Sequence, residues 1–289
     1  MNTTKPVMVG IDGSKAALRA AFWAADEAVA RDVPLCLVHA ARRGGGDADE
    51  LARAEHVLHT AWKAVADTGK SVDLQTEVLE GDPAQALIDA SERSVLMCLG
   101  HKGIHDGKSG TRGATAAAVL RGARSPVAMV RRCDDHTDPA YHRWIVVILD
   151  ESDNSQSIFE AAYSEALLRN SPLLVLADSP TIDCAACEDP ARECIRARLQ
   201  RYIRNASGGP ADVRVCVLAM PNDLLNMMRQ SASIDQLLVL ADDRTDLIDQ
   251  LTGTHGRKVL RKSWCSLLVV RDTKEDQRCI SHSSATSSR

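Results

Sequence analysis

The chain repeats itself, and the repeat constrains the fold more than any other feature. An apolar run over 7–11 leads into Asp12-Gly13-Ser14, and a second run over 145–149 leads into Asp150-Glu151-Ser152, 138 residues later. The same offset recurs where Glu165-Ala166 follows Glu27-Ala28, Pro172 follows Pro34, and Pro221 follows Pro83. Shared register over this distance indicates a tandem duplication, so two related units are expected in the 289 residues.

Strand-like and helical patterns alternate within the first unit. Short apolar runs over 7–11, 35–40, 72–79, 95–99 and 126–130 predict buried strands. Helical spacing of apolar residues predicts helices over 18–29, 47–67 and 115–121 and a short one after Pro83. Alternation of this kind predicts βαβ crossovers and a parallel sheet covered on both faces.

Composition shifts along the chain predict where these units end. We expect a first domain over 1–132, a polar linker over 133–143, a second domain over 144–272 and a disordered tail over 273–289. The tail is rich in serine and charge and lacks apolar residues for a core. With only 3% aromatic residues, both cores must be built from Ala, Val, Leu and Ile.

Charge and hydropathy exclude several function classes. A formal charge of −4 provides no basic field for nucleic acid or an acidic membrane. No apolar run reaches the length of about 18 residues that a membrane helix needs, and the N-terminus lacks a signal-peptide pattern. We therefore expect a soluble, cytoplasmic protein.

The strongest functional pattern is a glycine-spaced stretch between a strand-like run and an Ala-rich helix. It reads Gly100-His101-Lys102-Gly103, nine further residues, then Gly113-Ala114-Thr115. Glycines let the backbone approach a phosphate, and the N-terminus of the following helix offers unpaired N–H groups. With Lys102, Lys108 and Arg112 nearby, the stretch indicates anion binding rather than catalysis.

Four segments carry a family resemblance. They are Val9-Gly10-Ile11-Asp12-Gly13-Ser14, Val38-His39-Ala40, Gly81-Asp82-Pro83-Ala84 and the glycine-spaced stretch. Each half thereby resembles a universal stress protein domain, and the chain is similar to tandem actinobacterial members. The resemblance implies an α/β fold of two doubly wound parallel five-stranded sheets, strand order 3-2-1-4-5, with helices on both faces. It also implies ATP or another adenine nucleotide at the carboxyl ends of the strands, a stress-response role, a homodimer and a regulatory protein partner.

Carried over residue by residue, the resemblance assigns the nucleotide to Asp12, Ala40, Gly100, Gly103, Gly113, Ala114 and Thr115. Asp12 would lie near the ribose, the backbone around Ala40 against adenine, and the three glycines at the phosphates. The family's next position is normally Ser or Thr, but here it is Ala114, with Thr115 one position along. Mg²⁺ could accompany the triphosphate, with Asp12 as its carboxylate.

The second half departs from this pattern. Its matching loop begins Ala241-Asp242-Asp243-Arg244, without either early glycine, and Glu151 replaces the glycine after the first strand. Gly253-Thr254 keeps the closing pair. Lost backbone access and added negative charge predict that this half binds no ATP and serves as a structural partner.

Two other functions remain open from the sequence: a dimerising scaffold that binds no nucleotide, and a slow ATPase. We expect no enzyme, because no general base is identifiable. The segment Gly103 to Ser109 is one residue short of a Walker A loop. Cys184 and Cys187 have the spacing of a redox pair or half a zinc site, and their role stays open.

Several residues are interpreted as structural. His39 ends a strand-like run and is expected to be a satisfied packing residue. The arginines interpreted as a solvated face are Arg121, Arg124, Arg131 and Arg132.

Overall fold

The computed structural model describes residues 4–41, 48–101, 114–131, 143–150, 152, 154–178, 197, 199–204, 213–231 and 235–271. The first domain consists of β1 (Val7–Gly10), α1 (Lys15–Arg31), β2 (Leu35–Ala41), α2 (Ala48–Ala66), β3 (Leu74–Glu80), α3 (Pro83–Ser91), β4 (Leu96–Gly100), α4 (Ala114–Gly122) and β5 (Val127–Val130). The second consists of β6 (Arg143–Leu149), α5 (Ser155–Leu168), β7 (Leu173–Ala177), β8 (Val215–Ala219), α7 (Leu224–Gln230), β9 (Asp235–Ala241), α8 (Thr245–Thr252), α9 (Thr254–Lys262) and β10 (Cys265–Val270).

The strands form one ten-stranded sheet in the order β3-β2-β1-β4-β5-β10-β9-β6-β7-β8. All pairs within a domain are parallel, and each domain follows the predicted 3-2-1-4-5 path. The two predicted sheets are joined, however, because β5 pairs with β10 in antiparallel register, Ala128 opposite Leu268. Both strands are buried along their whole length, so each would expose an apolar edge without the other.

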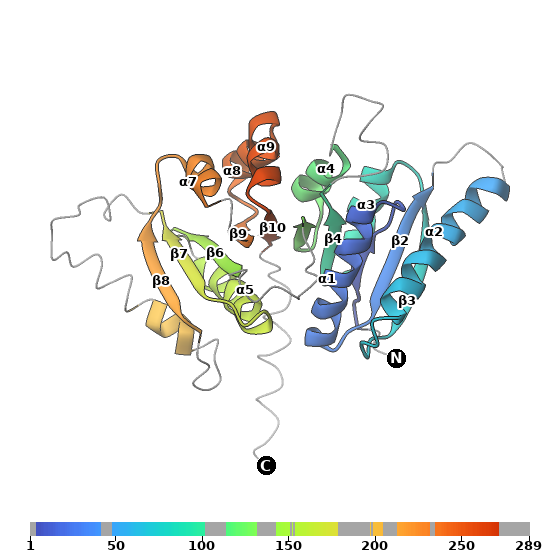
Figure 1. Ribbon diagram of the computed structural model, residues 1–289, viewed down its shortest axis with the longest axis horizontal. Coiled ribbons are helices and arrows are strands. Elements are labelled where there is room, and N and C mark those ends of the chain that lie inside the picture. The colour runs from blue at the N-terminus through green and yellow to red at the C-terminus, as the bar shows by residue number, and fades with distance from the viewer. Residues whose placement is uncertain are drawn as a thin grey trace, which may run out of the picture.

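The antiparallel joint relates the two domains by an approximate twofold axis perpendicular to the sheet. As a result α1 and α5 cover the same face, and α3, α4, α7, α8 and α9 cover the other (Figure 1). The strands of the two domains run in opposite directions, so their carboxyl ends lie at opposite edges of the sheet. Any pair of sites at those ends therefore opens in opposite directions.

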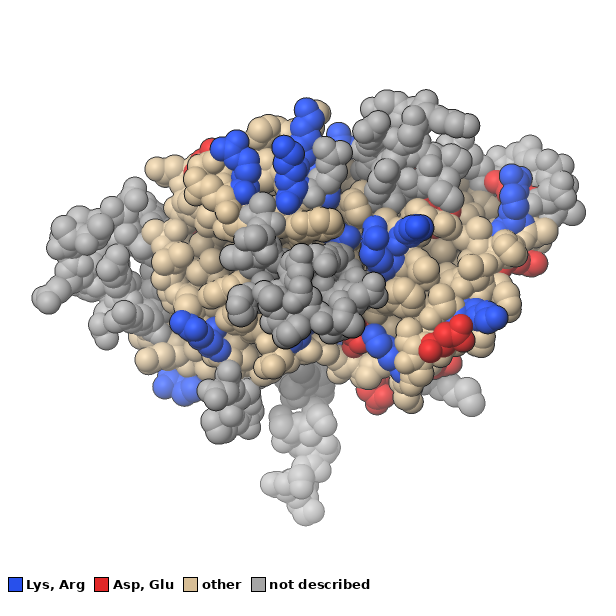
Figure 2. Space-filling model, viewed as in Figure 1, with Lys and Arg blue, Asp and Glu red and all other residues tan. Residues whose placement is uncertain are grey.

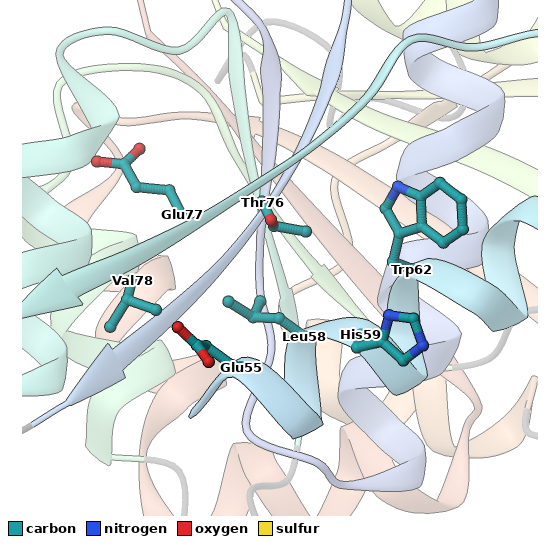
Figure 3. A pocket seen from close by; sticks show the side chains of 7 residues that line it. All are labelled: Glu55, Leu58, His59, Trp62, Thr76, Glu77 and Val78. Atoms are coloured by element: carbon teal, nitrogen blue, oxygen red, sulfur yellow. The ribbon is translucent and has the colours of Figure 1, made fainter. Parts of the chain in front are cut away.

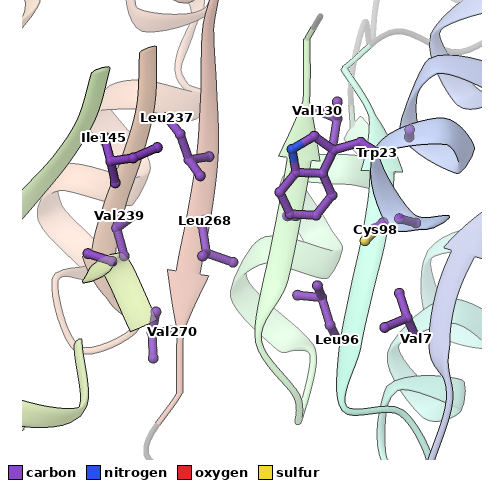
Figure 4. Close-up of a cluster of buried hydrophobic side chains, with 14 of the residues drawn as sticks. Val7, Trp23, Leu96, Cys98, Val130, Ile145, Leu237, Val239, Leu268 and Val270 are labelled. Carbon is purple, nitrogen blue, oxygen red and sulfur yellow. The ribbon is translucent and has the colours of Figure 1, made fainter. Parts of the chain in front are cut away.

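The apolar core on the α1 and α5 face is continuous across the joint. Figure 4 shows Leu96 and Val130 on the first-domain side of the cluster and Leu268 and Val270 on the second-domain side. All four side chains are buried. Burial of this kind contributes about 25 cal/mol for each Å² of apolar surface removed from water, which ties the domains together.

Local sequence explains the helix starts at the first-domain edge. The Ser14 hydroxyl accepts from the Ala17 N–H at 3.1 Å and caps α1. Asp82 caps α3 by accepting from the N–H groups of Ala84 and Gln85, and Pro83 occupies the first turn.

Predicted and observed boundaries differ in detail. Strand β6 begins at Arg143, the last residue of the predicted linker. The second-half stretch after Ala241 contains the helix α8, where only a loop was expected. Leu247, Ile248 and Leu251 are buried on one side of that helix, a spacing that could have revealed it. The predicted tail lies outside the described residues.

The interpretation of four arginines as a solvated face is wrong for Arg131, whereas Arg121 and Arg124 are exposed as predicted. Arg131 is buried at the end of β5, and its backbone N–H donates to the Ser266 hydroxyl of the other domain at 3.0 Å. Arg121 reaches across the joint to the Asp249 carboxylate at 2.7 Å. Both positions follow from the β5–β10 pairing, which sequence spacing did not reveal. Arg132 lies outside the described residues.

On the face shown in Figure 2, basic side chains gather over the second-domain helices at the top, whereas the first-domain side carries both signs. Helix α9 contributes Arg257, Lys258 and Lys262 to that basic side. Among the described residues, no helix is both long enough and apolar enough to cross a membrane.

Candidate functional site

The first-domain crevice lies where β1, β2 and β4 end side by side. The chain runs outward from β1 through β2 to β3, then returns to β4 on the other side of β1. Helices therefore leave neighbouring strands β1 and β4 toward opposite faces, which leaves a crevice between their ends. In open α/β sheets such a switch point is where ligands bind.

Asp12 lies in a tight turn between β1 and α1. Its Oδ1 accepts the Ser14 N–H at 2.9 Å, and Gly13 has φ of 84°, a left-handed conformation that favours glycine. The turn therefore holds the Asp12 carboxylate at the N-terminal end of α1. This side chain is half-buried just beyond the end of β1.

His39 and Ala40 are neighbours at the end of β2. His39 Nδ1 lies 2.7 Å from the Ile11 carbonyl oxygen, and the Ile11 N–H donates to the Val38 carbonyl at 2.8 Å. These bonds tie the ends of β1 and β2 together, so the predicted packing role of His39 is confirmed. Ala40 is half-buried beside it and adds no charged side chain to the crevice.

Gly100 closes β4 against the first turn of α1. A Cβ at this position would lie 2.6 Å from the Ala16 carbonyl carbon and 2.7 Å from the Ala17 nitrogen. Both atoms belong to the backbone, so no side chain can move aside. Close packing therefore requires this glycine, whatever its part in binding a phosphate.

The remaining predicted residues are described only in part. Ala114 is the exposed first residue of α4, and Thr115 follows it half-buried. Gly103 and Gly113 lie outside the described residues, as do Cys184 and Cys187. The structure thus brings Asp12, the Ala40 backbone and Gly100 to one edge of the sheet. Thr115, the second residue of α4, carries a hydroxyl in the first turn of that helix.

The second-domain crevice lies at the corresponding strand ends but is lined by different side chains. Asp150 follows β6 as Asp12 follows β1, and its Oδ1 likewise accepts a serine N–H, from Ser152, at 2.9 Å. Asp178 follows β7 at the position of Ala40. The Arg244 guanidinium lies between them, with Nη2 2.6 Å from Asp178 Oδ2 and Nη1 3.7 Å from Asp150 Oδ2.

Strand register identifies the counterpart of Arg244. Val7 pairs with Leu96 in the first domain, and Ile145 pairs with Leu237 in the second. Counting forward along the sequence from these pairs, Arg244 corresponds to Gly103, which lies outside the described residues. A glycine expected to admit phosphate is therefore replaced by a guanidinium that joins two carboxylates.

Electrostatics of the second crevice follow from this ion-pair arrangement. Burial acts to raise the pKa of Asp150, but hydrogen bonds from Ser152 and the charge of Arg244 hold it below its ordinary value. Burial and the charges of Asp150 and Asp242 raise the pKa of Asp243. An anionic phosphate would meet these carboxylates and would compete with them for Arg244.

A separate hollow of 530 Å³ lies at the outer edge of the first domain, between α2 and β3. Figure 3 shows Leu58, His59 and Trp62 of α2 on one side and Thr76 and Val78 of β3 on the other. None of the residues assigned to the nucleotide lines this hollow. It is therefore distinct from the crevice at the strand ends.

Comparison with known proteins identifies the family. The sequence profile of the universal stress protein family matches residues 3–131 and again residues 142–271. The chain belongs to the universal stress protein family. This tandem universal stress protein is 35% identical to universal stress protein Rv2028c of Mycobacterium tuberculosis over 273 residues, 91% of this chain and 95% of that one.

One solved structure supports the fold over nearly the whole chain. A crystal structure of a universal stress protein from Archaeoglobus fulgidus covers 93% of this chain and 97% of its own, with a TM-score of 0.65 and 16% identity. A further universal stress protein from Archaeoglobus fulgidus, 26% identical with a TM-score of 0.36, covers 43% of this chain and 96% of its own. That protein was solved in complex with dAMP.

Proposed function

We propose that the first domain binds an adenine nucleotide, ATP in particular, and that the second domain binds none. The observation that carries this proposal is the contrast between the crevices. In the second, Arg244 bridges Asp150 and Asp178, whereas the first has Ala40 at the position of Asp178, and in sequence Gly103 corresponds to Arg244.

Each described residue of the first crevice has a part in this proposal. The Asp12 carboxylate is placed to accept hydrogen bonds from ribose hydroxyls, and the backbone beside Ala40 offers N–H and C=O groups to the adenine edge. The N-terminus of α4 supplies backbone N–H groups for phosphate, with Thr115 as a nearby hydroxyl. Mg²⁺ bound with ATP would supply charge neutralisation for the triphosphate, and Asp12 is the carboxylate placed to help hold it.

The proposed role is regulatory binding in the response to stress, not catalysis. The resemblance assigns residues of the first crevice to nucleotide contacts and none to a general base. Nucleotide binding would act on the segment between Gly100 and Thr115 and so on a protein partner. A dimerising scaffold that binds no nucleotide is the alternative within the same fold.

Nucleotide release and calorimetry on the full chain test the proposal. The purified protein is denatured, any released nucleotide is identified by chromatography, and ATP is titrated into wild type, Asp12→Ala and Asp150→Ala. We expect one nucleotide per chain, an affinity lowered about tenfold by Asp12→Ala, and no change from the matched Asp150→Ala variant.

Other outcomes decide between the alternatives. Ala40→Asp places a carboxylate at the position of Asp178 and should weaken ATP binding further. Two nucleotides per chain would overturn the assignment of the second domain. No bound nucleotide and no heat of binding would leave the scaffold, and steady release of phosphate from ATP would show an ATPase.

A further inference from the structure

The hollow between α2 and β3 lies along an open edge of the sheet. Strand β3 is the outermost strand of the first domain, and among the described strands it pairs only with β2. The Leu35 N–H of β2 donates to the Asp73 carbonyl oxygen at 2.8 Å, so every second residue of β3 from Asp73 onward turns its main chain toward β2. The main-chain N–H and C=O groups of Thr76 and Val78 therefore point outward, where another strand could pair with them.

Apolar and aromatic side chains line the hollow on the side of α2. Leu58 is buried and Val78 is half-buried, whereas the Trp62 side chain is 38% exposed. The His59 ring is stacked on Trp62, with the ring centroids 6.4 Å apart and the planes 7° from parallel. Figure 3 shows these side chains around the same 530 Å³ space. An exposed tryptophan beside an open strand edge is typical of a surface that binds a partner.

The charge of the hollow is negative. Glu77 of β3 is neutralised by Arg93, whose Nη1 and Nη2 lie 3.0 Å and 2.6 Å from the two carboxylate oxygens. Glu55 of α2 is exposed and forms no ion pair with any other described residue. No lysine or arginine is among the described residues that line the hollow. A cationic group would gain both the Glu55 carboxylate and the face of an aromatic ring.

We propose that the outer edge of β3 binds an extended basic segment of a partner protein as an additional strand. Main-chain groups of the segment would exchange hydrogen bonds with those of Thr76 and Val78. Every second side chain of the segment would point toward α2, where an arginine or lysine meets the Trp62 ring and Glu55. The other side chains would lie beside the neutralised Glu77, where uncharged residues fit. The segment is thus recognised by alternating basic and uncharged residues.

A second copy of this chain fits the same edge less well. Pairing through its own β3 would bring two Glu55 carboxylates to the joint and no additional cation to balance them. The proposed surface is also separate from the nucleotide crevice, since none of the residues assigned to the nucleotide lines the hollow. Binding at β3 therefore does not depend on the proposed nucleotide function.

Calorimetry on the full chain tests the recognition. The probe is a blocked hexapeptide of alternating arginine and threonine, and the control peptide has glutamate in place of arginine. We expect saturable binding of the basic peptide alone, weakened by salt and unchanged by ATP. Glu55→Lys and Trp62→Ala should each lower the affinity about tenfold. The matched changes Glu160→Lys on α5 and Trp264→Ala, at a tryptophan that is 47% exposed, should leave it unchanged.

Hydrogen exchange tests the added strand. The Thr76 and Val78 amides should gain protection when the basic peptide is added, whereas the amide of Val217, on the edge strand β8 at the other end of the sheet, should not. Thr76→Pro removes one outward N–H and leaves the bonds to β2 in place. It should lower the affinity for the peptide about tenfold.

Three results would overturn the proposal. The first is no saturable binding of the basic peptide up to about 1 mM, or equal binding of the acidic one. The second is an affinity that neither Glu55→Lys nor Trp62→Ala changes. The third is a wild-type dimer in sedimentation that Thr76→Pro converts to a monomer, which would assign the edge to a second copy instead.

Discussion

The guanidinium of Arg169 lies over the indole of Trp23, with its central carbon 4.6 Å from the ring centroid. This contact joins α5 of the second domain to α1 of the first and breaks the symmetry of the duplicated helices. The counterpart of Trp23 in the second domain is Ala161, so Arg31 has no such cover. The Arg31 side chain is accordingly 36% exposed, against 5% for Arg169.

This asymmetry predicts unequal effects of removing the two arginines. Arg169→Met leaves a buried carboxylate without its better partner and should lower the free energy of unfolding by about 3 kcal/mol. Arg31→Met, closer to solvent, should lower it by about 1 kcal/mol. Urea unfolding of both variants measures the difference. Equal losses would show that burial does not distinguish the two positions.

Stability should depend on pH with a sign set by Glu165. Its pKa is raised in the folded state, so its contribution is complete below about pH 4.5 and is lost as the pH rises through about 8. Between these values the free energy of unfolding should fall by about 1 kcal/mol for each pH unit. Denaturant unfolding across that range should show the slope in wild type and a flatter profile in Glu165→Gln.

Glu27 contributes in the opposite direction. The charges of Arg169 and Arg31 outweigh burial and lower its pKa, so its contribution is present above about pH 4.5 and lost on further acidification. Glu27→Gln should therefore lose stability at neutral pH but approach wild type in acid. A variant that stays equally destabilised down to its acid transition would contradict an ionised Glu27.

Gly100 and Gly10 offer a matched comparison at the first crevice. Gly100→Ala directs a methyl group into the α1 backbone and should cost about 3 kcal/mol. In Gly10→Ala the new methyl group would lie 2.8 Å from Leu99 Cδ2, at the end of a flexible side chain, and in ordinary contact with the Leu87 methyl groups, so the change should cost about 1 kcal/mol. Thermal unfolding measures both. A larger loss for Gly10→Ala would contradict the packing role of Gly100.

Arg244→Ala should open the second crevice without creating a nucleotide site. Asp150 and Asp178 would lose their shared cation, and the free energy of unfolding should fall by about 1 kcal/mol, because the arginine side chain is 17% exposed. The loss should shrink in high salt, which screens the repulsion left behind. Arg229→Ala, on the exposed side of α7, is the control. ATP binding in the second domain of Arg244→Ala would show that the carboxylates are no barrier.

Sequence patterns predicted the alternation of strands and helices along the chain because it depends on local signals, whereas the spatial order 3-2-1-4-5 was implied by the family resemblance. Short apolar runs, Gly13 with its left-handed φ, and the caps Ser14 and Asp82 all act within a few residues. The joint between β5 and β10 could not be predicted in this way. The sequence of a buried apolar strand does not indicate which other strand it pairs with. The antiparallel pairing of Ala128 with Leu268 therefore depends on tertiary packing.

The ion pairs between α1 and α5, formed by Glu27, Arg31, Glu165 and Arg169, were missed for a different reason from the second crevice. The repeat of Glu27 at Glu165 was visible, but burial of both and the position of the twofold axis depend on the joint. In the second crevice Asp242 and Asp243 were expected to repel phosphate, whereas Asp242 pairs with Arg271, at 3.2 Å. Arg244 instead forms an ion pair with Asp178, and the spacing of the two residues along the chain does not indicate this contact.

The pairing of β5 with β10 has a consequence for how such a protein can change. In an assembly of two identical subunits, every substitution in a crevice appears in both copies. One copy therefore cannot lose ligand binding while the other retains it. Here both halves belong to one chain, and their pairing is independent of concentration. The second crevice could therefore exchange a glycine for Arg244 while the first kept its open strand ends. Duplication thus lets one domain become a permanent structural subunit for the other.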